Sequence, residues 1–206
     1  LVHTPLLIWD PRSGRRGVRC ESLVQTIDLP ATILEFFGLD RPKDMQGLPL
    51  RDALAGDAPV HDAVLFGVMG GHINCTDGRY VYMLAPTADN QPLNNYTLMP
   101  MHMQNMFTPD NLKDAVMAEP FDFTKGCPVM KIPTWRFPHQ QTVADDGPAQ
   151  FETALYDIQE DPQQMAPFRD EKIEAMMTAH ILRLMRETDA PDEQYERMGL
   201  TAAVPG

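Results

Sequence analysis

The first forty residues carry a hydrophobic pattern typical of an α/β unit. Residues 4–9 form an apolar run of strand length, which ends at Asp10-Pro11. Because positions on both sides of the alternation are apolar, the run predicts a parallel strand that is buried on both faces.

Residues 28–38 carry the signals of a helix that follows this strand. Asp28 can accept hydrogen bonds from free backbone N–H groups, and Pro30 lies in the first turn, where its missing donor costs nothing. The apolar face of this helix would consist of Leu29, Ile33, Phe36 and Phe37. Gly38 suits the left-handed position after the last turn. Such a helix would pack on the preceding strand, as in doubly wound α/β folds.

The pattern changes near residue 58, where short apolar runs replace the strand and helix signals. The dipeptide Asp77-Gly78 is typical of a tight hairpin turn, and residues 79–84 after it are rich in β-forming side chains. Residues 154–158 would add another strand. These features predict an antiparallel meander, with a domain boundary near residue 58.

The C-terminal half combines a Pro-rich stretch with a long helix. Residues 86–150 predict irregular segments, together with one helix over residues 109–118 that begins at Thr108-Pro109. Residues 170–187 predict an amphipathic helix. Its apolar side would consist of Ile173, Met177, His180, Ile181, Leu184 and Met185.

Three stretches of the chain resemble type I sulfatases, a family of the alkaline phosphatase-like superfamily. Residues 153–164, Thr-Ala-Leu-Tyr-Asp-Ile-Gln-Glu-Asp-Pro-Gln-Gln, are similar to the family's C-terminal stretch "E-L-Y-D-L-x-x-D-P-x-E". Residues 68–85 resemble its hairpin "T-D-G-R-Y-K-Y", and residues 1–39 resemble its late core strand and the helix after it. The stretches at 1–39 and 153–164 occur in the family's order and bracket most of the chain.

The resemblance implies an α/β fold: the C-terminal portion of an alkaline-phosphatase-like sulfatase core plus a small antiparallel sheet subdomain with a C-terminal helix. It places the last strand and helix of the α/β core in residues 1–58. The antiparallel subdomain would occupy residues 59–206, with the Pro-rich stretch 86–150 as a long insertion.

Sulfatases hydrolyse sulfate monoesters with one divalent cation, usually calcium, and a formylglycine made from Cys or Ser in a Cys-x-Pro/Ala-x-Arg motif. In the family this motif and the metal carboxylates belong upstream of the position of residue 1. The resemblance therefore implies no catalytic residue and no metal ligand in this chain. It implies calcium and formylglycine in the full-length parent, an N-terminal sulfatase portion as partner, and a small sulfate ester as substrate.

Two other functions remain open at this point. Phosphonate- and phosphodiester-cleaving hydrolases share the same architecture. The resemblance therefore indicates the superfamily more firmly than it indicates which kind of ester is cleaved. A non-catalytic binding or assembly module that reuses the sulfatase C-terminal half is an alternative from a different functional class.

A sulfatase-like spacing also occurs within the chain, at Cys75-Thr76-Asp77-Gly78-Arg79. The distance from Cys to Arg is that of the nucleophile motif, but its third position holds Asp77 in place of Pro or Ala. Because Asp-Gly is a turn dipeptide and the run precedes a predicted strand, we expect a hairpin turn here.

Three residues are candidates for contact with the substrate. In the family the C-terminal subdomain lies over the mouth of the active site, so His72 and Asn74 would touch the substrate's leaving group, beside the flexible pair Gly70-Gly71. The other interpretation is that both satisfy backbone groups at a bend. His3 precedes the first predicted strand and would lie at the edge of the pocket.

Net charge and cysteine content limit the classes of binding partner and the state of the thiols that we expect. The formal net charge of −12 argues against nucleic acid and anionic membrane surfaces as partners, because both require a basic surface. Cys20, Cys75 and Cys127 are odd in number and widely spaced, which predicts reduced thiols. The compartment stays open between cytoplasm and periplasm. Because a strand at residues 4–9 would expose a sheet edge, we also expect self-association.

Overall fold

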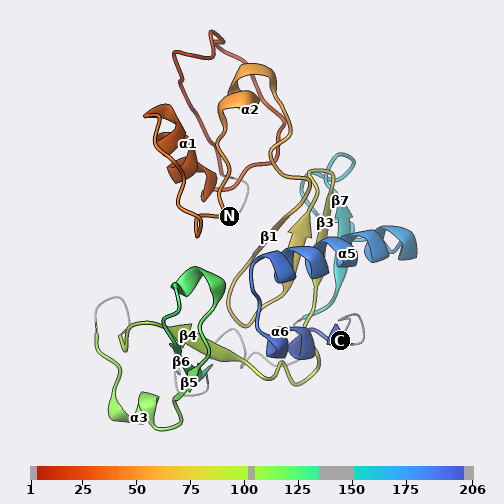
Figure 1. Ribbon diagram of the computed structural model, residues 1–206. Helices are drawn as coiled ribbons and strands as arrows, with labels where there is room; N and C mark the ends of the chain where they lie inside the picture. Colours follow the sequence, from red (N-terminus) through yellow and green to blue (C-terminus); the bar gives the residue numbers. More distant parts are fainter. Residues whose placement is uncertain (1–3, 102–104, 135–150, 202–206) are drawn as a thin grey trace.

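The computed structural model describes residues 4–101, 105–134 and 151–201. Figure 1 shows a short helical region at one end, a four-stranded sheet with a long helix in the centre, and a second small sheet to one side. The helical region holds α1 (Asp28–Phe36) and α2 (Arg51–Gly56).

The central sheet confirms the predicted antiparallel meander. Its strands pair in the order β1-β2-β3-β7, and every pairing is antiparallel. Their bounds are β1 Val64–Gly67, β2 Ile73–Thr76, β3 Tyr80–Leu84 and β7 Ala154–Asp157. The hairpin between β2 and β3 turns at Asp77-Gly78, where Gly78 has a φ of 92°. Asp77 Oδ1 accepts hydrogen bonds from the backbone N–H groups of Arg79 and Tyr80, which closes the turn.

Helix α5 (Glu171–Glu187) packs across β1 and β2, as predicted for residues 170–187. Asp170 caps its first turn by accepting hydrogen bonds from the N–H groups of Lys172 and Ile173. The buried core between the helix and the sheet contains Cys75, Tyr82, Leu155, Met177, Ile181 and Met185. The short helix α6 (Asp192–Arg197) follows and adds Tyr195 to this core.

A second sheet lies within the Pro-rich stretch, where the sequence predicts irregular structure and one helix. Its strands, in the order β4-β6-β5, are β4 Asn94–Thr97, β5 Val116–Ala118 and β6 Val129–Pro133. The predicted helix over 109–118 is wrong beyond its first turn. Helix α3 (Pro109–Leu112) begins as expected with a capping box at Thr108, but Val116 to Ala118 pair with β6 instead. A 3₁₀ turn, η1 (Asp122–Thr124), joins β5 to β6.

The predicted buried strand at residues 4–9 is also wrong. The segment has no strand structure, and Leu7 and Trp9 are 95% and 75% exposed. A strand needs a neighbour to accept its backbone hydrogen bonds, and within the described residues no strand lies beside this segment. The chain turns at Asp10, whose carboxylate accepts hydrogen bonds from the Arg12 guanidinium.

Helix α1 forms as predicted but buries a different face. Gly38 takes the expected left-handed conformation, with a φ of 68°. The predicted apolar face is largely in solvent, since Ile33, Phe36 and Phe37 are exposed. The buried side chains of α1 are instead Asp28 and Ala31. An apolar surface over α1 and residues 4–9 is therefore left uncovered by the described chain.

Candidate functional site

His72 lies in the connection between β1 and β2, as the sequence predicts for a bend next to Gly70-Gly71. Its Nε2 donates a hydrogen bond to the carbonyl oxygen of Glu152 at 3.0 Å. The imidazole also packs edge-on against Phe151, with 5.1 Å between the ring centroids. These contacts tie the bend to the segment that leads into β7.

Asn74 lies on β2 and is buried, with 7% of the residue exposed. Strand alternation places it on the opposite face from Cys75, which packs in the core beneath α5. Its Oδ1 is buried and has no hydrogen-bond partner among the described residues. A buried acceptor without a donor is costly, and the described residues supply no donor for this amide oxygen.

His72 and Asn74 are two residues apart, His72 in the β1–β2 connection and Asn74 on β2. The third candidate, His3, lies outside the described residues. Substrate binding by all three remains a prediction.

The Cys75-to-Arg79 run has the geometry of a turn. Cys75 is fully buried, and burial raises the pKa of its thiol to about 12, so it remains protonated at neutral pH. Arg79 points to Asp157 on β7, with 2.9 Å between Nη2 and Oδ2. A buried thiol and a guanidinium held by another carboxylate do not make a nucleophilic site, so the turn prediction is confirmed.

A buried Asp28–His61 pair is a polar centre that the sequence does not reveal. Asp28, which is completely buried, accepts hydrogen bonds from the N–H groups of Gln25 and Leu48 at 2.7 and 2.8 Å. His61 Nε2 lies 2.9 Å from Asp28 Oδ2. Asp28 is therefore not the predicted helix cap. It joins the start of α1 to two later segments, and no local motif signals a partner 33 residues away.

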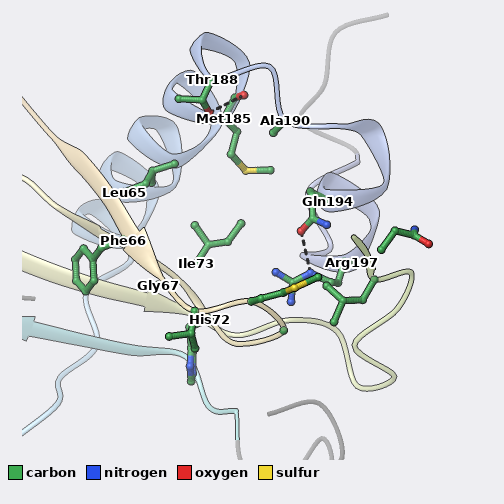
Figure 2. A pocket seen from close by; sticks show the side chains of 15 residues that line it. Leu65, Phe66, Gly67, His72, Ile73, Met185, Thr188, Ala190, Gln194 and Arg197 are labelled. Atoms are coloured by element: carbon green, nitrogen blue, oxygen red, sulfur yellow. Dashed lines mark hydrogen bonds between the residues drawn. The ribbon is translucent and has the colours of Figure 1, made fainter. Parts of the chain in front are cut away.

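A pocket of about 340 Å³ lies between the β1–β2 connection, the end of α5 and α6 (Figure 2). Most of its lining is apolar and includes Leu65, Ile73, Leu93 and Met185. His72 lies at its edge, with the imidazole directed away from the hollow in Figure 2. Arg197 of α6 also lines the pocket and was not singled out by the sequence, because α6 is almost wholly polar in composition.

Within the part of the chain that the structure describes, no group of three or more His, Cys, Asp or Glu side chains is placed to hold a metal ion. None of the helices described is both long and apolar enough to cross a membrane.

Comparisons with known proteins do not identify a family for this chain. No protein-family model matches the sequence, and a search of curated proteins finds no match to it.

Proposed function

We propose that this chain is the C-terminal portion of a sulfatase-like hydrolase of the alkaline phosphatase-like superfamily. In the full-length parent, calcium and formylglycine would be supplied by an N-terminal sulfatase portion. This chain would complete the fold and shape the pocket around a small sulfate ester, with His72 and Asn74 beside the leaving group.

The observation that carries this proposal is the pairing of two sulfatase-like stretches in one sheet. The stretches at 68–85 and 153–164 contribute β3 and β7, which lie side by side with Tyr80 opposite Asp157 and Tyr82 opposite Leu155. The Arg79–Asp157 ion pair joins the same two stretches. Since both resemble the same family subdomain, their association in a single antiparallel sheet supports a common origin for the pair.

The uncovered apolar surface near the N-terminal side supports the same proposal. Leu7, Trp9 and Phe37 are 95%, 75% and 70% exposed, and they belong to the stretch 1–39, whose sequence resembles the late core strand and helix of sulfatases. Large exposed apolar surfaces commonly mark contacts with another part of a protein. An N-terminal sulfatase portion would cover this surface.

The candidate substrate residues offer a suitable polar group. The unpaired Oδ1 of Asn74 can accept a hydrogen bond from a hydroxyl group of the ester's alcohol part. A sulfate group carries only acceptor oxygens, so this carbonyl favours contact with the leaving group over contact with the sulfate itself.

The proposal is tested first by the gene sequence upstream of the codon for Leu1. An open reading frame that encodes Cys/Ser-x-Pro/Ala-x-Arg and a pair of Asp residues is the expected result. An upstream sequence without the nucleophile motif would overturn the enzyme proposal and favour a binding or assembly module.

A second test uses variants of the full-length enzyme. His72→Ala and Asn74→Leu should each lower kcat/KM several-fold on a sulfated disaccharide, because one hydrogen bond is worth about 1 kcal/mol. The same variants should alter hydrolysis of 4-nitrophenyl sulfate much less, since that ester offers little beyond the sulfate. Equal losses on both substrates would instead assign these residues a structural role.

A further inference from the structure

Arg197 carries a buried positive charge that no carboxylate neutralises within the described structure. The residue is 3% exposed, and its guanidinium donates hydrogen bonds to three neutral acceptors. Nε bonds Gln194 Oε1 at 3.0 Å, while Nη1 bonds Gly71 O at 3.1 Å and Asn90 Oδ1 at 2.8 Å. Burial lowers the pKa of Arg197 from 12.5 to about 10, so the group stays charged at neutral pH.

Unlike Arg197, several described arginines form ion pairs with carboxylates. Arg12, Arg51, Arg79, Arg169 and Arg183 all contact carboxylates near the surface. A buried charge without a counter-ion is costly, and such a group is normally paired. Glu193, a partly buried carboxylate on the same helix α6, is bonded to Lys131 and to the amide of Asn94 instead.

One nitrogen of the guanidinium makes no hydrogen bond to a described residue. Nε and Nη1 are occupied, whereas Nη2 has no acceptor among the residues that the structure describes. Arg197 lines the pocket of about 340 Å³, and Figure 2 shows the group reaching from α6 towards the β1–β2 connection. A buried cation with two N–H donors that no described residue uses thus lies against a cavity.

Most of the remaining lining is apolar. It includes Leu65, Val68, Met69, Ile73, Leu93 and Met185, beside the uncharged polar side chains of Asn94, Thr188 and Gln194. The volume is at the lower end of the range of about 300–1,000 Å³ typical of small-molecule sites. A single cation in an apolar cavity favours a ligand that has one anionic group and a hydrocarbon body.

We propose that this pocket binds a small amphipathic anion, with a sulfate or carboxylate head on Arg197 Nη2 and an apolar body against Leu65, Ile73 and Met185. The two donors of Nη2 and the charge would fix the head group. The proposal does not depend on a sulfatase function, because every residue that it uses is described in this chain.

Isothermal titration calorimetry of the purified chain tests the site with octyl sulfate, octanoate and octanol as probes. Octyl sulfate and octanoate should bind at one site, and comparison of the two identifies the preferred head group. Octanol has the same tail without the charge and should bind at least about tenfold more weakly, because a hydrogen bond to a charged group is lost. Equal binding of octanol, or no binding of either anion, would overturn the proposal.

Two variants assign any binding to this pocket. Arg197→Met should abolish the preference for the anions over octanol. Val68→Glu provides a second test that spares the fold, since Val68 is 68% exposed at the pocket rim. It should weaken binding of the anions about tenfold or more and leave octanol unchanged. Val18→Glu, at a 51% exposed position outside the pocket lining, makes the same change in net charge and should have no such effect. Unaltered anion binding in Val68→Glu would contradict the assignment.

Discussion

Cys75 should be the least reactive of the three thiols. It is fully buried under α5, whereas Cys20 and Cys127 are exposed. In the native chain, a thiol-specific reagent should therefore modify two cysteines quickly and the third only after unfolding. Modification of Cys75 at the rate of Cys127 would show that the turn is open to solvent.

The same burial predicts a pH dependence of stability. The pKa of Cys75 rises from 9.0 to about 12 on folding, so between these values the unfolded chain has lost a proton that the folded chain retains. The stabilising effect is therefore fully present below pH 9 and is lost as the pH rises towards 12. The difference in unfolding free energy between wild type and Cys75→Ala should shrink from about pH 8 to about pH 11. If the difference in unfolding free energy stayed the same across this pH range, it would contradict the raised pKa of Cys75.

Gly47 is required by a close backbone approach. A Cβ atom at this position would lie 1.9 Å from the carbonyl oxygen of Ile27, just before α1. Gly47→Ala should lower the free energy of unfolding by about 2–4 kcal/mol, as measured by urea denaturation. Gly56→Ala is the matched control, because no atom lies within 4 Å of its added Cβ. Similar stabilities of the two variants would show that the loop around Gly47 can move away.

At the scale of elements, Asp28 determines how α1 is attached to the chain around it. Asp28→Asn would weaken acceptors for Gln25, Leu48 and His61, and should cost about 2–4 kcal/mol in urea denaturation. Asp52→Asn, on the exposed surface of α2, should change stability by no more than about 0.5 kcal/mol. A loss of less than about 1 kcal/mol in Asp28→Asn would mean that the three donors form hydrogen bonds with water instead.

Elements with strong local signals could be predicted from the sequence. Helix α5 has a capping Asp170 and a regular apolar stripe, and the β2–β3 hairpin has its Asp77-Gly78 turn. Each of these signals acts within a few residues.

Features that depend on distant partners could not be predicted in the same way. Strand β4 begins with Asn94-Asn95, residues that are depleted in strands, and it forms only because β6 pairs with it across about 35 residues. The Asp28–His61 pair and the burial of Arg197 likewise depend on contacts far along the chain. The strand predicted at residues 4–9 lacks a neighbouring strand in the described chain, so its apolar side chains remain exposed.

At the scale of the whole molecule, the uncovered apolar surface should promote self-association. Leu7 and Phe37 are 95% and 70% exposed on this surface. Sedimentation at tens of micromolar should therefore detect species heavier than the 23.2 kDa monomer. The double variant Leu7→Ser/Phe37→Ser should shift the chain towards monomer. Met165→Ser, at another highly exposed position, should not. A wild-type chain that sediments only as a monomer would contradict this prediction.

The proposed role of the chain within a sulfatase-like hydrolase is tested by hydrolysis of 4-nitrophenyl sulfate with calcium. The activity is compared between the chain alone and the polypeptide that includes the segment encoded upstream. Bis(4-nitrophenyl) phosphate and a 4-nitrophenyl phosphonate ester serve as comparison substrates. We predict no turnover by the chain alone. The longer polypeptide should hydrolyse the sulfate ester faster than both phosphorus esters. Turnover by the chain alone that is lost in Cys75→Ala, or a longer polypeptide inactive on sulfate esters, would contradict the proposed role.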